Sequence, residues 1–247
     1  VKTAKRIIHA QVERSVKPSP HAVEPWCPHV ADCGACAWQH FSLEAARDWK
    51  QKHVRETLAR IGKVDAPVVH PLVPSPSGRE YRNKMSFAFA PAADPAGGAL
   101  LGLRKFRERT VVEVTECGLQ PPQVMQLLAQ VRQTVNRLGL EAWQQESGEG
   151  YLRFLVVHTP LYAPKGKKQL LVECITGTNH KRVSGPGNGE EGQKPLSNAE
   201  KVRELGLELM KDYDLTGFVH SERASRPDVA QGERTRFLAG AGEYQER

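Results

Sequence analysis

Three of the five cysteines lie within ten residues, in the run CPHVADCGACAWQH at positions 27–40, and no other stretch limits the fold as strongly. A group this local must form disulfides, bind a metal, or be a coincidence. Disulfide pairing would leave one of five thiols over, and Cys33 and Cys36 are too close in sequence to close a stabilising loop. The run therefore favours a metal site.

The composition indicates a compartment in which thiols stay reduced. A chain of 247 residues with 39% hydrophobic residues can bury a core without disulfide cross-links. No stretch approaches the roughly 18 apolar residues of a membrane span, and the first sixteen residues alternate in charge and apolarity, unlike a signal peptide. We expect a cytoplasmic protein with no membrane partner, and the sequence implies no protein partner.

A fourth metal ligand is needed to complete the cysteine group. Cys27, Cys33 and Cys36 fill three corners of a tetrahedral site, and Gly34 permits a tight turn between them. Cys117, in VTECGLQPP, is the candidate fourth ligand, whereas Cys174 in LLVECIT is typical of a buried small side chain. Four thiolates suit either a structural zinc ion or a [4Fe–4S] cluster.

The hydrophobic periodicity predicts an α+β fold. Helices are expected at 43–61, after the N-cap residue Ser42, and at 122–138, with apolar residues on one stripe. A third helix is expected at 197–212. Runs rich in β-branched and apolar residues predict strands at 83–90, 100–106, 110–117, 151–159, 169–176 and 215–221. We expect an antiparallel sheet with packed helices and a cysteine-ligated cluster loop.

The charge balance favours a polyanionic partner. Lys and Arg number 35 against 28 Asp and Glu. Residues 79–109 hold seven basic and three acidic residues, so positive charge is concentrated there. A solvated sheet face is the alternative interpretation of the same residues.

Several segments together resemble a known family. PSPHAVEPWCPHVADCGACAWQH, KQKHVRETLARIG, YRNKMSFAF, LGLRK and ECGLQ occur in the order and spacing of the iron–sulfur RNA 5-methyluridine methyltransferases. The similarity covers approximately residues 4–180 and, more loosely, 196–247. It implies an RNA partner, ribosomal or transfer RNA, and a [4Fe–4S] cluster held by Cys27, Cys33, Cys36 and Cys117.

The resemblance also implies RNA contacts. The YRNK stretch is similar to a segment that faces RNA in this family, and three further basic residues are candidates. The full set is Tyr81, Arg82, Asn83, Lys84, Arg104, Lys105 and Arg153. Alternatively, Tyr81 packs in the core, Arg82 pairs with Glu80, and the other three are solvated surface residues.

Members of this family have a β-barrel domain, then a central domain, then a Rossmann-like methyltransferase domain that uses S-adenosylmethionine. By that plan, residues 1–16 are a barrel remnant, 17–62 the cluster loop and helix, and 63–247 the central domain, with a flexible insertion at 183–196. The methyltransferase domain is then absent, together with every catalytic and cofactor-binding residue. S-adenosylmethionine would serve only the full-length enzyme.

These inferences predict a fragment of an RNA uracil-C5 methyltransferase that supplies the cluster and the RNA-binding region for 23S ribosomal RNA, and that is inactive alone. A transfer RNA enzyme of the same family is one alternative. A stand-alone metal-binding module that binds RNA or acts as a scaffold is the other.

Overall fold

The computed structural model describes residues 2–4, 7–9, 12–93, 98–160, 170–178 and 196–243. Most of the expected insertion at 183–196 lies outside this part. The chain divides into two compact units, Val1–Trp26 with Trp38–Pro74 and Cys27–Ala37 with Ser75–Arg247. The cysteine loop thus belongs to the same unit as the sheet, whereas the sequence grouped it with the helix that follows.

The first unit contains a short hairpin and one helix. Strand β1 (Lys2–Ala4) pairs antiparallel with β2 (Ile7–His9), and α1 spans Leu43–Arg60. The predicted N-cap is confirmed, because the Ser42 hydroxyl accepts a hydrogen bond of 3.3 Å from the backbone N–H of Ala45.

The second unit is built on a seven-stranded sheet. Its order is β5-β4-β3-β6-β7-β8-β9. The strands are β3 (Lys84–Pro91), β4 (Ala99–Arg104), β5 (Val111–Glu113), β6 (Leu152–His158), β7 (Leu170–Thr176), β8 (Leu215–Glu222) and β9 (Arg234–Gly240). The central strand β6 is buried over almost its whole length, which explains its nearly continuous apolar sequence.

The sheet is mixed, so the predicted antiparallel sheet is wrong. Strands β7 and β8 pair in parallel, whereas the other neighbouring strands pair antiparallel. Two adjacent parallel strands need a crossover connection, and helix α3 (Asn198–Asp212) lies between them in the chain. The strands and the helix expected at 169–221 are present, but the parallel pairing of the two strands was not predicted.

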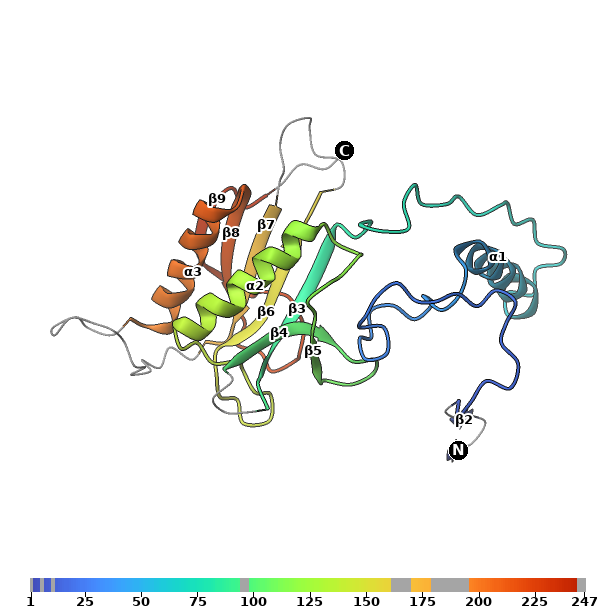
Figure 1. Cartoon of the computed structure of the whole chain (residues 1–247), viewed down its shortest axis with the longest axis horizontal. Helices are drawn as coiled ribbons and strands as arrows, with labels where there is room; N and C mark the ends of the chain where they lie inside the picture. The colour runs from blue at the N-terminus through green and yellow to red at the C-terminus, as the bar shows by residue number, and fades with distance from the viewer. Residues whose placement is uncertain are drawn as a thin grey trace. The chain divides into compact units, whose positions relative to one another are not determined.

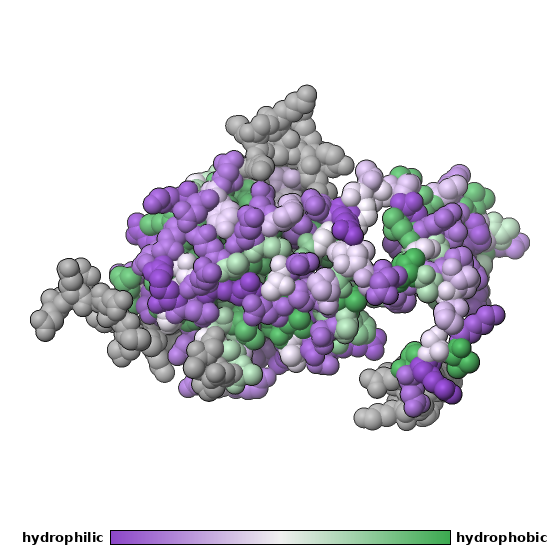
Figure 2. All heavy atoms as spheres, viewed as in Figure 1, coloured by the Kyte–Doolittle hydropathy of each residue, from purple (hydrophilic) through white to green (hydrophobic). Residues whose placement is uncertain are grey.

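Two helices cover one face of the sheet (Figure 1). Helix α2 (Pro122–Arg137) buries the predicted stripe, and Gly139 follows it with a φ of 60°, which glycine adopts readily. Helix α3 starts with a capping box between Ser197 and Glu200. The outward sides of both helices are largely hydrophilic (Figure 2).

The main core lies between these helices and the sheet. Fully buried residues from both layers include Phe87, Leu127, Leu128, Leu155, Leu205 and Phe218. A smaller cluster on the opposite sheet face contains Ala88, Phe154, Val156 and Ile175. In the described part of the chain, no helix has the length and apolarity needed to cross a membrane.

Leu209→Ala should destabilise the protein by about 2–5 kcal/mol, because the side chain is fully buried and its removal leaves a cavity. Leu207→Ala is the matched control in the same helix. Leu207 is 50% exposed, so its replacement should change stability by only about 0.5 kcal/mol. Urea unfolding curves of both variants test this, and equal shifts in midpoint would contradict the assigned helix face.

Candidate functional site

The cysteine loop lies against the hairpin formed by β4 and β5. The backbone N–H of Gly34 donates to the Arg104 carbonyl over 2.9 Å, and Cys33 forms an isolated bridge with Lys105. A Cβ on Gly34 would lie 2.6 Å from the backbone nitrogen of Phe106. Glycine is therefore required for this close approach, whereas the sequence suggested only a tight turn.

The four predicted ligands, Cys27, Cys33, Cys36 and Cys117, all lie partly buried in the second unit. Burial raises the pKa of Cys117, and the charges of Cys36, Cys27 and Cys33 raise it further. Burial also raises the pKa of Cys33, which Cys36 and Cys27 increase. Backbone groups of Ala35 and Leu119 hydrogen-bond to the sulfurs of Cys33 and Cys117 and oppose these shifts.

Two contacts brace the loop around these thiols. The His29 Nε2 lies 3.2 Å from the Thr115 hydroxyl and accepts a 3.2 Å hydrogen bond from the Thr115 backbone N–H. The Lys105 ammonium lies 3.2 Å from Asp32. Both contacts join the loop to the segment between β4 and Cys117, so they hold the two halves of the cysteine group together.

Arg82 connects the YRNK stretch to the same site. Its guanidinium donates to the Ala35 carbonyl over 3.5 Å, in the loop between the cysteines. Its own carbonyl accepts hydrogen bonds from the Gln120 side chain at 2.7 Å and the Thr159 hydroxyl at 3.1 Å. Arg82 is thus part of the support of the cysteine site rather than a solvated cation.

The other YRNK residues face solvent. Tyr81 is 44% exposed, and Asn83 and Lys84 are also exposed. The alternative that Tyr81 packs in the core does not fit this placement. Two further candidates are engaged in ion pairs, Arg104 with Asp228 at 2.5 Å and Lys105 with Asp32.

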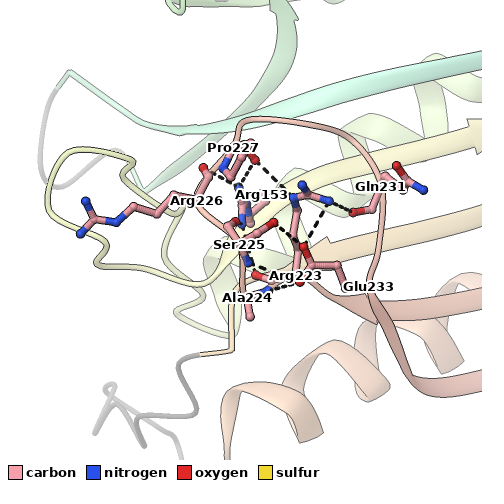
Figure 3. Close-up of polar contacts among 8 residues, drawn as sticks. All are labelled: Arg153, Arg223, Ala224, Ser225, Arg226, Pro227, Gln231 and Glu233. Carbon is pink, nitrogen blue, oxygen red and sulfur yellow. Dashed lines mark hydrogen bonds and ion pairs between the residues drawn. The ribbon is translucent and has the colours of Figure 1, made fainter.

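Arg153 lies in the interior, with 3% of its surface exposed. Its two terminal nitrogens donate to four backbone carbonyls of the 223–227 segment, and its guanidinium lies 4.0 Å from the centre of the Trp143 ring. Figure 3 shows the segment wrapped around this side chain, with the Arg226 side chain pointing away. Burial and nearby Arg223 lower the pKa of Arg153. The structure gives this guanidinium a structural role.

Glu233 links the far end of this segment back to its start. Its carboxylate accepts hydrogen bonds from the backbone N–H groups of Ala224, at 2.9 Å, and Ser225, and lies 3.5 Å from Arg223 (Figure 3). The Ser225 hydroxyl, followed by the Ala224 N–H, lowers the pKa of Glu233. The 223–233 segment is therefore held at both ends by charged side chains.

Sequence reasoning missed two of these roles. His29 had no visible partner pattern, since Thr115 is far from it in sequence. Arg153 sits at a register shift between β6 and β7, a bulge that moves its side chain to the sheet face without helices. Strand periodicity contains no signal for a bulge.

Cys174 behaves as predicted. It is fully buried in the main core, and burial raises its pKa to about 12. Such a thiol is inert as a nucleophile or a metal ligand. In the part of the chain that the structure describes, no three His, Cys, Asp or Glu side chains are grouped as for a bound metal ion.

Comparison with known proteins identifies relatives along nearly the whole chain. No protein-family model matches the sequence. The chain is 36% identical over 238 residues to an uncharacterized RNA methyltransferase of Nitratidesulfovibrio vulgaris, covering 96% of this chain and 46% of the relative. It is 35% identical over 124 residues to 23S rRNA (uracil(1939)-C(5))-methyltransferase RlmD of Bordetella pertussis, covering 50% of this chain and 26% of the relative.

The fold is also similar to a solved structure, that of Pyrococcus abyssi tRNA (uracil-54, C5)-methyltransferase in complex with S-adenosyl-L-homocysteine. The TM-score is 0.61 at 19% identity, over 95% of this chain and 45% of that one. This chain spans about half the length of the curated relatives that match most of it. Its homologues are thus RNA methyltransferases.

These matches correct the expected domain content. The prediction that the methyltransferase domain is absent, and that the chain is a fragment supplying only a cluster and an RNA-binding region, is wrong. Proteins named as RNA methyltransferases match 96% of the chain, and a methyltransferase structure shares its fold over 95%. The prediction that the chain is inactive depended on the absence of the methyltransferase domain, so it is wrong as well.

Gly34→Ala should destabilise the protein by about 1–3 kcal/mol, because the new methyl group would overlap the backbone of Phe106. Gly242→Ala is the control, since its added Cβ would meet only ordinary contacts with Leu238. Urea unfolding of the two variants measures the difference. Equal stability would show that the loop does not depend on this close approach.

Proposed function

We propose that this chain belongs to an S-adenosylmethionine-dependent enzyme that methylates C5 of uracil in ribosomal or transfer RNA. The observation that supports this most is the 36% identity to a protein named as an RNA methyltransferase over nearly the whole chain. Two similar proteins are named for uracil C5, one acting on 23S ribosomal RNA and one on transfer RNA. The basic net charge of +7 is consistent with an RNA substrate.

The exposed YRNK residues are the proposed RNA contacts in the second unit. Lys84 and Asn83 can donate to phosphate oxygens, and Tyr81 offers a ring on which a base can stack. Arg82, within the same stretch, donates a hydrogen bond to the cysteine loop. RNA bound here would therefore touch a surface whose shape depends on the cysteine site.

The four clustered cysteines are proposed to hold a [4Fe–4S] cluster. The proposal rests on four thiols from two distant segments that influence one another's pKa, and on backbone hydrogen bonds to two of the sulfurs, contacts that are typical of iron–sulfur sites. A zinc ion would need all four sulfurs about 2.3 Å from one point. A cluster is larger, so it suits a loop and a remote cysteine better. Bound there, it would cross-link the loop to the start of the connection to α2.

The described residues do not form a complete cradle for S-adenosylmethionine, which supplies the methyl group in this proposal. Rossmann-like sites lie at the carboxyl ends of neighbouring parallel strands. The described part offers one parallel pair, β7 and β8, and residues 179–195 after β7 lie outside it.

Anaerobically purified protein should contain about four irons and four sulfides per chain. Cys36→Ser and Cys117→Ser should each lose most of the iron, because every ligand is required to hold the cluster and metal binding contributes to folding. Cys174→Ala is the control and should retain the iron, since Cys174 lies apart in the core. Metal and sulfide analysis with visible absorbance measures this. One zinc per chain would refute the cluster.

Deleting the gene that encodes this chain should remove 5-methyluridine from one position in ribosomal or transfer RNA. Mass spectrometry of digested RNA from the deleted and complemented strains measures the loss and its reversal. Reintroducing the gene with Cys36→Ser should restore less of the modification than Cys174→Ala. Unchanged 5-methyluridine in both RNA classes would refute the proposed activity.

A further inference from the structure

A cavity of about 230 Å³ lies on the sheet face that carries no helix. Apolar lining comes from the end of β3 and from β5, through Pro91 and Val111. The polar side contains Gln145, Arg153 and, at the opening, Arg109. The volume is smaller than that of ordinary drug-sized sites, and it suits a single planar ring system.

Two of the residues that line this cavity each have a buried polar atom without a hydrogen-bond partner. The Nε of Arg153 and the Oε1 of Gln145 are both shielded from solvent. Buried polar groups are almost always paired, because an unpaired donor or acceptor costs about 1–3 kcal/mol. One of these atoms is a donor and the other an acceptor, so a ligand edge that offers both an acceptor and a donor would satisfy them together.

Arg153 is held rigidly for such a role. The bulge in β6 turns its side chain to this face, its terminal nitrogens are fixed by the four carbonyls of the 223–227 segment, and its plane lies against Trp143. Only Nε remains unpaired. The donor is therefore pre-organised, which reduces the entropy lost when a ligand binds.

An exposed ion pair between two of the lining residues is the second feature of this cavity. Arg109 and Glu146 form an ion pair of 3.4 Å, with side chains 62% and 80% exposed. An exposed pair of this kind contributes about 0–1 kcal/mol, so Arg109 can exchange Glu146 for another anion at little cost. A guanidinium binds phosphate oxygens in a bidentate manner.

We propose that this cavity binds one unpaired base of an RNA strand, with the adjoining phosphate on Arg109. The proposal rests on the proposed RNA function and extends it to a second contact region, separate from YRNK. A nucleobase is planar and presents donors and acceptors along one edge, and proteins that read single-stranded RNA hold extruded bases in this way. Gln145 and Arg153 read the base edge, and Arg109 holds the backbone.

The test uses the whole chain and a single-stranded RNA oligonucleotide carrying one 4-thiouridine. Irradiation with long-wavelength ultraviolet light followed by mass spectrometry locates the adduct, which is expected within residues 143–146 or 89–91. Gln145→Leu, which keeps the size but removes the amide, should lower the adduct yield about tenfold. Gln126→Leu, on the exposed side of α2, is the matched control and should leave the yield unchanged.

Arg109→Gln is a second variant, chosen because an exposed residue can be replaced without affecting folding. It should lower the affinity for the oligonucleotide and reduce the slope of log affinity against log salt by about one. Adducts confined to Tyr81 and its neighbours, with Gln145→Leu equal to Gln126→Leu, would overturn the base pocket and leave the RNA function standing. RNA that neither binds nor cross-links anywhere would overturn both.

Discussion

The close contact between Gly34 and the backbone of Lys105 and Phe106 determines the geometry of the cysteine site. The absence of a Cβ lets the loop approach to hydrogen-bonding distance of Arg104. The β4–β5 hairpin is the element that leads on to Cys117, so docking the loop on it brings residues 27–36 to a cysteine far along the chain. The position of the cysteine loop therefore depends on a contact between backbones, with no cysteine side chain involved.

Arg82 connects the cysteine site to the exposed surface. Its guanidinium holds the loop, and its backbone is fixed by Gln120 and Thr159, so the neighbouring Tyr81, Asn83 and Lys84 are presented from a rigid base. Any change that moves the loop will move these side chains as well. The cysteine loop and the exposed YRNK side chains are thus linked through one arginine.

The sequence predicted the parts of the fold that depend on neighbouring residues. The buried stripe of α2 and the N-cap of α1 both follow from local spacing. The parallel pair β7–β8 did not, because periodicity reports which side of a strand is buried and contains nothing about strand direction. Likewise the charges of Arg104, Lys105 and Arg153 pointed to a basic surface, although their partners Asp228, Asp32 and the 223–227 carbonyls are visible only in the tertiary structure.

The two faces of the sheet are stabilised by different means. Helices α2 and α3 cover one face with apolar side chains, a non-directional interaction that tolerates substitutions of similar volume. On the other face, Arg153 fixes the 223–227 segment through directional hydrogen bonds from a planar group. A lysine has three donors and no planar fork, so it could not make the same four bonds. Directional hydrogen bonds hold side chains in fixed positions, and the cavity beside Arg153 lies on the sheet face that is stabilised in this way.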